Sequence, residues 1–230
     1  MIYLSGDTHG TFDLQKVEDF FEIEKLMRDV SKQDYLIILG DTAICWDGGA
    51  KDDWVRERLQ KLPVTVLWLD GNHENFDLLS EYPVAGWHGG KVHRIAPNII
   101  HLMRGCCFEI EGKTFWTFGG AFSIDKMYRT ENVSWWQQEM PNKEEYGRGL
   151  HSLEECNFQV DYILTHTAPR HVAEAICDTI YPGEEELQYY LQDISEKTEF
   201  KEWYFGHWHM DVAVLDKYHG LMEDIVRLDI

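Results

Sequence analysis

The amino-acid sequence predicts an α/β protein in which one domain contains two β-sheets. The first third of the chain alternates strand-like apolar runs with helix-like segments, an order typical of parallel strands. The middle and the end add further short apolar runs, one pair of which is joined by a turn signal. Neither an internal repeat nor a change of composition divides the 230 residues, so residues 1–230 are predicted to form a single domain.

The first third has the order strand, helix, strand, helix, strand. Residues 2–5, 35–39 and 64–69 are strand-sized apolar runs, and each ends near a glycine. The segment after the first run has apolar residues close to the helical period, at Leu14, Val17, Phe20, Phe21, Met27 and Val30. A second amphipathic segment runs from about residue 52 to residue 62, where Pro63 ends it. This order implies parallel strands whose two faces are both buried.

The rest of the chain is read as shorter strands with two helical regions. The predicted strands are residues 91–95, 99–102, 107–110, 113–118, 160–165, 203–205, 212–215 and 225–228. Glu111-Gly112 between two of these runs indicates a hairpin. Residues 135–148 are polar and aromatic and are predicted to be loop and helix, while residues 184–198 are predicted to be an acidic, solvated helix.

Composition limits the partners. The chain has 41 acidic and 21 basic residues, a formal net charge of −20, which makes duplex nucleic acid and anionic membranes poor partners. No apolar run approaches the roughly 20 residues of a membrane span. The start of the chain lacks the features of a secretory signal, and the five cysteines are odd in number with no Cys-x-x-Cys spacing. These features predict a cytoplasmic protein without a membrane partner.

Five predicted strands are followed by residues of the types that bind metal ions. These residues are Asp7, His9, Asp41, Asn72, His166, His207 and His209. Ligands bind beyond the carboxyl ends of strands in open α/β sheets, so the five blocks are expected to converge. Each block alone has an ordinary structural alternative, such as a helix N-cap, a turn or a core histidine. The repetition of the pattern at five strand ends argues against those alternatives.

The chemistry of this set predicts two divalent metal ions. Carboxylate, imidazole and amide groups without cysteine suit Mn²⁺, iron or Zn²⁺. A pair of ions needs about eight bonds from the protein, which seven side chains supply if one carboxylate bridges both ions. Two ions roughly 3.5–4 Å apart can clamp a phosphoryl group and activate a water molecule.

The ordered motifs resemble those of the calcineurin-like metallophosphoesterases. The motifs that carry the resemblance are Asp7-x-His9, Gly40-Asp41, Gly71-Asn72-His73-Glu74, His166 and Gly206-His207-x-His209. The resemblance implies a four-layer α-β-β-α sandwich of two mixed β-sheets flanked by helices. It assigns Asp7, His9 and His209 to a first metal ion. It assigns Asn72, His166 and His207 to a second, with Asp41 bridging the two. His73 would be catalytic: it would stabilise the transition state or protonate the leaving oxygen.

The sequence departs from the Ser/Thr protein phosphatase branch of this family. That branch continues its second motif with Val-Asp-Arg-Gly, whereas Asp41 is followed here by Thr-Ala-Ile-Cys-Trp-Asp. Asp47 is a candidate for the missing carboxylate, and Arg129 and Arg170 are candidates for the missing phosphate-binding arginine. An aromatic rim that stacks a base or ring is a further possibility, formed by Trp46, Trp87, Trp135 and Trp136.

The resulting hypothesis is a dinuclear metal-dependent phosphoesterase. A metal-bridging hydroxide would attack a phosphomonoester or phosphodiester, with Mn²⁺ as the first expectation and iron or Zn²⁺ as the alternatives. The predicted partner is a small phosphorylated substrate, and the sequence predicts neither its identity nor the oligomeric state. The alternative is a catalytically silent interaction scaffold of the same fold. A zinc amidohydrolase is disfavoured because Asp7-x-His9 does not match the His-x-His that follows the first strand in that class.

Overall fold

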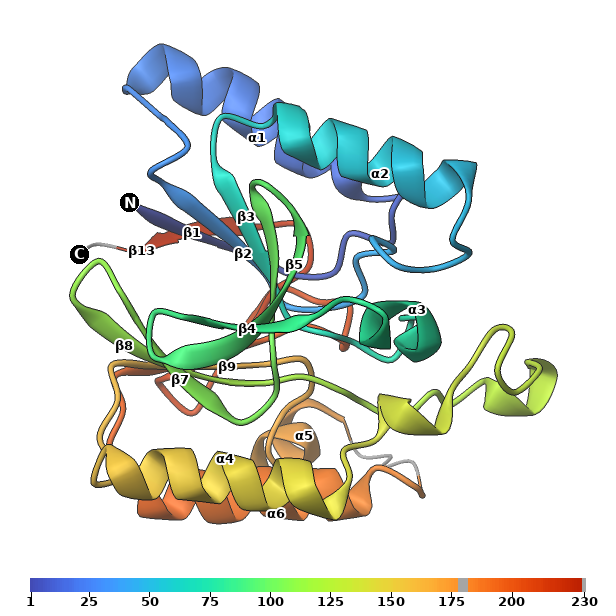
Figure 1. The fold of residues 1–230 in the computed structure, drawn as a ribbon. Coiled ribbons are helices and arrows are strands. Elements are labelled where there is room, and N and C mark those ends of the chain that lie inside the picture. The colour runs from blue at the N-terminus through green and yellow to red at the C-terminus, as the bar shows by residue number, and fades with distance from the viewer. Residues whose placement is uncertain (178–181, 229–230) are drawn as a thin grey trace.

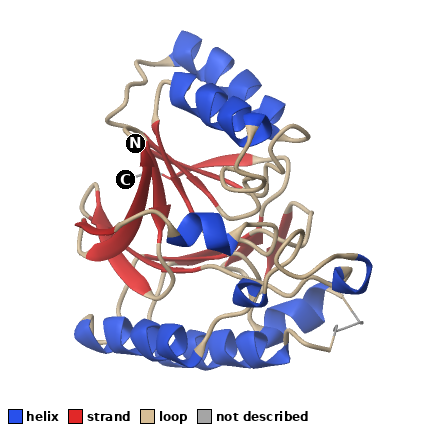
Figure 2. Cartoon of the chain, turned by 45° about the vertical axis from the view of Figure 1, so that its right-hand side comes forward, coloured by secondary structure: helices blue, strands red, loops and turns tan. Residues whose placement is uncertain are grey.

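Two sheets lie face to face between two layers of helices (Figures 1 and 2). A computed structural model describes residues 1–177 and 182–228. The four layers, helix, sheet, sheet and helix, confirm the sandwich that the sequence motifs implied.

The first sheet has seven strands in the order β13-β1-β2-β3-β6-β5-β4. They are β1 (Ile2–Ser5), β2 (Tyr35–Ile38), β3 (Thr65–Trp68), β4 (Val84–Trp87), β5 (Gly90–Ala96), β6 (Ile99–Leu102) and β13 (Ile225–Leu228). β1, β2, β3 and β6 run parallel, with Leu4 beside Ile37 and Ile37 beside Leu67 in the register. β13 and β5 pair antiparallel to their neighbours, so the sheet is mixed.

The second sheet has six strands in the order β11-β12-β10-β9-β8-β7. They are β7 (Cys106–Ile110), β8 (Lys113–Phe118), β9 (Tyr162–Thr165), β10 (Glu202–Phe205), β11 (Val212–Val214) and β12 (Tyr218–Gly220). β8, β9, β10 and β12 are parallel, and β7 closes one edge through the predicted hairpin. Glu111 and Gly112 in that turn both have positive φ, as a two-residue hairpin loop requires.

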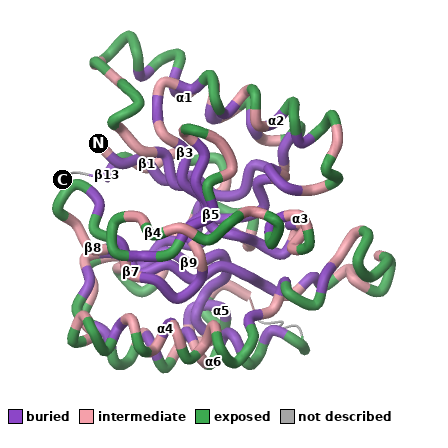
Figure 3. Tube along the Cα trace, viewed as in Figure 1, coloured by how far each residue is buried: buried purple, intermediate pink, exposed green. Residues whose placement is uncertain are grey.

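Helices cover the outer face of each sheet. α1 (Leu14–Met27) and α2 (Ala50–Lys61) lie on the first sheet, and α4 (Lys143–Glu155), α5 (Arg170–Ile176) and α6 (Glu185–Lys197) lie on the second. Successive residues of β1 pack in two different hydrophobic cores. Ile2 and Leu4 pack between the two sheets, while Tyr3 packs between the first sheet and α1. The central strands β1, β2, β3, β9 and β10 are therefore buried on both faces, whereas the edge strands are partly exposed (Figure 3).

Among the α-helices and strands of the described residues, the sequence predicted the longer ones and missed four short ones. The missed elements are α3 (Phe76–Ser80), β4, α5 and β12. α3 has five residues and starts at the Asn75 cap, too short to show a helical period. β4 is an edge strand with exposed and half-buried residues only, and it contains Trp87, one of the four tryptophans considered for an aromatic rim. None of the helices formed by the described residues is long and apolar enough to span a bilayer.

A buried charge network joins the end of β3 to the rest of the sandwich. Asp70 Oδ2 accepts a hydrogen bond from Arg104 Nε at 2.6 Å, and its Oδ1 lies 3.0 Å from His101 Nε2. Burial would raise the pKa of the Asp70 carboxyl, but Arg104 and His101 hold it well below its usual range. Arg104 also donates to the Glu139 carbonyl and to Glu145, so one guanidinium links three separate segments.

This network predicts a large loss of stability for Asp70→Asn. The change removes the charge that compensates Arg104, of which 3% is exposed, and should lower the free energy of unfolding by about 3–5 kcal/mol. Asp53→Asn is the matched control because its carboxylate, 71% exposed, pairs with Arg56 on the surface, and that change should cost less than about 1 kcal/mol. Urea unfolding measures both. Equal, small losses would contradict the role given to Asp70.

Candidate metal centre

The predicted ligands gather where the carboxyl ends of five parallel strands meet. Asp7, Asp41 and Asn72 follow β1, β2 and β3 of the first sheet. His166 follows β9 of the second sheet, and the Gly-His-Trp-His segment follows β10. The face-to-face sheets thus bring together residues that are up to 202 positions apart in the sequence.

Unusual backbone conformations direct several of these side chains. His9, Asp41, His207 and His209 all have positive φ, at 38°, 50°, 65° and 48°. Non-glycine residues adopt this region rarely, and clusters of such residues mark functional sites. Glycine is needed beside them, because a Cβ on Gly71 would overlap the Asp41 carboxylate.

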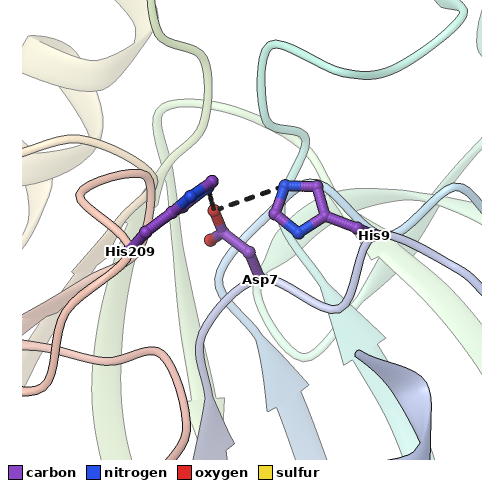
Figure 4. A group of neighbouring side chains, drawn as sticks. All are labelled: Asp7, His9 and His209. Atoms are coloured by element: carbon purple, nitrogen blue, oxygen red, sulfur yellow. Dashed lines mark ion pairs between the residues drawn. The ribbon is translucent and has the colours of Figure 1, made fainter. Parts of the chain in front are cut away.

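Asp7, His9 and His209 form one group of possible ligands (Figure 4). Asp7 Oδ2 lies 3.2 Å from His209 Nε2 and 4.0 Å from His9 Nε2. Ligands bound to one ion at about 2.1 Å lie roughly 3–4 Å from each other, so these separations suit a shared cation. Asp13 Oδ2 lies 2.8 Å from His9 Nδ1, which leaves Nε2 of His9 toward the group.

Asn72 and His207 are both neighbours of His166. His166 Nδ1 is 2.6 Å from the Leu39 carbonyl, an acceptor only, so Nδ1 carries a proton and donates it. His166 Nε2 then faces the Asn72 side-chain oxygen at 3.1 Å. The rings of His166 and His207 are 5.1 Å apart. Asn72 Nδ2 donates to Ser123 Oγ, which orients the side-chain oxygen of Asn72 toward His166.

Asp41 lies between the two sets. Its Oδ1 is 3.5 Å from His166 Nε2, and its Oδ2 is 3.6 Å from His9 Nε2. The His73 backbone N–H donates to Oδ1 at 2.7 Å and fixes the carboxylate. Asp7 also belongs to a second group of possible ligands with Asp41 and His166, so both carboxylates contribute to the junction.

The electrostatics of this cluster favour an added cation. Burial lowers the pKa of His9, but Asp41, Asp7 and Asp13 outweigh burial and raise it to about 9. Burial likewise opposes protonation of His166, yet Asp41 and Asp7 raise its pKa to about 10. Two buried carboxylates therefore favour the protonated form of the neighbouring imidazoles. A divalent ion bound in the same place would compensate the negative charge of the carboxylates in the same way. The oxygen and nitrogen donors fit the divalent ions expected from the sequence.

His73 lies at the edge of this cluster, next to Arg129. Arg129 Nη1 is 2.7 Å from His73 Nδ1, and Nη2 is 3.2 Å from His73 Nε2. The nearest Asp41 oxygen is 3.9 Å from His73 Nε2. Burial lowers the pKa of His73, and although Asp41 opposes this effect, Arg129 and His9 add to it. Arg129 itself is held by Asp125 at 2.7 Å, in a segment that projects from the sandwich.

The structure separates the remaining candidates. Arg170 pairs with Glu174 on its own helix at 2.7 Å, and its guanidinium lies over Tyr189. These two contacts direct the Arg170 side chain toward α5 and α6. Asp47 Oδ1 accepts the Gly49 N–H in a turn, and the carboxylate found next to the His73 ring is that of Asp41.

The four tryptophans do not form one rim. Trp46 stands 6.2 Å from the His73 ring and 6.0 Å from the ring of Trp136. Trp136 is buried, with its indole N–H donated to Asp77. Trp87 packs in β4 with Tyr35 and His88 instead. Trp135 lies next to Lys126, and it is Trp46 that contacts His73 at the candidate centre.

Sequence reasoning missed several residues that hold the ligands in place. Glu184 Oε1 lies 3.6 Å from His207 Nε2, and Ser123 and Asp13 bond to Asn72 and His9. Of these three residues, only Asp13 is close in sequence to a predicted ligand, since it follows His9 by four positions. Glu184 and Ser123 come from distant segments, and nothing in their local sequence distinguishes them.

The fold and the cluster of oxygen and nitrogen donors together suit a protein that holds divalent metal ions. A family profile described as calcineurin-like phosphoesterase matches residues 1–211, so the chain belongs to that family. Membership confirms the resemblance found in the motifs and implies divalent metal ions as cofactors. No curated protein matches the chain.

A solved structure from Staphylococcus aureus shares the fold. It is described as a "Putative 5'-Nucleotidase" in complex with alpha-ketoglutarate, and it is similar to this chain with a TM-score of 0.53 and 16% sequence identity. The match covers 96% of this chain and 48% of that chain, so this chain spans about half the length of that protein. At this identity the likeness establishes the architecture.

The raised histidine pKa values predict that metal binding releases protons. At pH 7 His9 and His166 are protonated in the metal-free protein, whereas a ligand imidazole must be neutral. Loading at pH 7 should therefore release about two protons, and apparent affinity should rise with pH until about pH 9–10. Calorimetry in buffers of different ionisation enthalpy counts these protons.

The surface residue His151 provides the control for this measurement. Its side chain is 70% exposed on α4, so His151→Asn should leave proton release unchanged, while His9→Asn should reduce it by about one. Metal binding at pH 7 that releases no protons would contradict the assignment of His9 and His166.

Proposed function

We propose that this protein is a dinuclear metal-dependent phosphoesterase that hydrolyses a phosphomonoester or phosphodiester. The observation that carries the proposal is the position of Asp41, whose two oxygens face His166 on one side and His9 on the other. A bridging carboxylate between two sets of nitrogen and oxygen donors is what a pair of ions requires. Asp7, His9 and His209 would hold one ion, and Asn72, His166 and His207 the other.

In this proposal the metal ligands and Arg129 have different roles around the phosphoryl group. When bound, two divalent ions offset the charge of the phosphoryl oxygens and acidify a water molecule that serves as the nucleophile. Arg129 supplies fixed positive charge beside His73 and suits a phosphoryl oxygen through its planar guanidinium. Asp125 and the Ser134 carbonyl hold that guanidinium in place.

His73 would assist the leaving oxygen. Its side chain is 28% exposed, unlike that of Asp41 at 1%, so it is accessible to a substrate. Its lowered pKa favours the neutral imidazole in the free protein, but a bound phosphate anion favours the protonated form that can donate a proton. Proton donation of this kind contributes about 10²–10⁴ in rate.

The metal and the surroundings follow from the same residues. Imidazole, carboxylate and amide donors make Mn²⁺ the first choice, with iron or Zn²⁺ as alternatives. The net charge of −20 favours a small phosphorylated substrate over a polyanion, and the five free cysteines suit a cytoplasmic location. Arg170 could bind substrate only after its ion pair with Glu174 is broken.

The function is tested by ester hydrolysis with matched leaving groups. Metal-stripped protein reloaded with Mn²⁺, iron or Zn²⁺ should hydrolyse p-nitrophenyl and alkyl esters, and chelation should abolish activity. His73→Asn should keep its metal and lower kcat by about 10²–10⁴ for alkyl esters. The loss should be smaller for p-nitrophenyl esters, because their leaving oxygen is already stable as an anion.

His209→Asn is the control for ligand loss, since it should lower metal content and impair both kinds of ester alike. A His73→Asn protein that loses metal, or whose defect ignores the leaving group, would overturn the role of His73. Wild-type protein that binds metal but hydrolyses no ester would favour the silent scaffold instead.

A further inference from the structure

A cavity of about 490 Å³ opens beside the candidate metal centre. His9, Asp41, His73 and His209 line one side of it, so it is continuous with the proposed reaction site. Its size falls within the range of small-molecule sites and leaves ample space beyond a phosphoryl group.

The other side of the cavity is apolar and aromatic. Phe12, Ala43, Trp46 and Val55 line it, from the loops after β1 and β2 and from α2. Phe12 is 83% exposed although it lies only three residues beyond His9. A large apolar side chain held in water beside a reaction site gains contact area when an apolar group binds there.

The charged residues of this wall are compatible with a phosphorylated ligand. Asp52 is occupied by the backbone N–H groups of Trp46, Asp47 and Gly48, and Asp13 contacts His9. Lys51 also lines the cavity, and it forms no ion pair with any residue that the structure describes. Positive charge at the wall offsets the repulsion that the acidic protein exerts on an anion.

We propose that this cavity binds an aromatic ring carried by the alcohol portion of the phosphate ester. The inference rests on the proposed function, because it uses His73 as the group next to the leaving oxygen. His73 borders both the metal cluster and the cavity, so an ester oxygen beside it directs its substituent toward Phe12 and Trp46. Two aromatic side chains favour a ring over an aliphatic chain through stacked or edge contacts.

Non-hydrolysable phosphonates test ring binding apart from leaving-group chemistry. Benzylphosphonate, cyclohexylmethylphosphonate and ethylphosphonate are compared as competitive inhibitors of p-nitrophenyl ester hydrolysis by the metal-loaded protein. Benzylphosphonate should bind about 10- to 100-fold more tightly than ethylphosphonate, with the cyclohexyl compound between them.

Variants locate the effect in the cavity. Phe12→Ala and Trp46→Ala should each reduce the preference for benzylphosphonate over ethylphosphonate by about threefold or more, and Trp46→Phe should retain most of it. Trp54→Ala is the control, because Trp54 is an exposed residue of α2 whose ring lies under Arg58 instead of lining the cavity. The exposure of Phe12 makes Phe12→Ala a variant that keeps the fold.

Three outcomes are decisive. A benzyl preference that depends on Phe12 supports the inference, and esters of a nucleoside, a tyrosyl peptide and benzyl alcohol then identify the source of the ring. Equal inhibition by the benzyl and ethyl compounds, with p-nitrophenyl ester hydrolysis intact, overturns the inference and leaves the proposed function standing. If the metal-loaded protein hydrolyses no ester, the result contradicts the proposed function and also the inference that rests on it.

Discussion

Two carboxylates held away from water, those of Asp7 and Asp41, set the central requirement of this structure. Each is at most 1% exposed, and an isolated buried carboxylate is strongly disfavoured unless positive charge or hydrogen bonds compensate it. The histidines around them supply part of that charge, as the raised pKa values of His9 and His166 show. The geometry of the cluster is therefore suited to binding cations between Asp7 and Asp41.

The sandwich provides the positions that this cluster needs. Parallel strands end at the same edge, and two such edges, one from each sheet, face each other across the ligands. The Asp70–Arg104 pair ties the end of β3 to residues 123–139, the segment that projects from the sandwich and carries Arg129. Arg104 donates to the Glu139 carbonyl, and the Glu139 side chain accepts the Ser123 N–H. Ser123 in turn bonds to Asn72, so the segment that carries Arg129 is anchored to the centre it serves.

The sequence predicted what depends on local pattern and strand order. Strand-sized apolar runs followed by ligand-type residues located β1, β2, β3, β9 and β10 together with the cluster at their ends. The sequence could not tell which of Arg129 and Arg170 lies beside His73, because the position of each arginine depends on tertiary contacts. The same limit applied to Trp87 and Trp136: an aromatic residue in an irregular stretch packs inward or faces a site according to neighbours distant in sequence.

The central claim is that Asp41 is shared by two neighbouring ions, and electron paramagnetic resonance of the manganese-loaded protein tests it most directly. Two Mn²⁺ ions bridged at roughly 3.5–4 Å interact magnetically. The account predicts a coupled, multi-line spectrum at two equivalents of Mn²⁺, replaced by the signal of separate ions in Asp41→Asn. A wild-type spectrum that shows only isolated Mn²⁺ at every loading would contradict the shared centre.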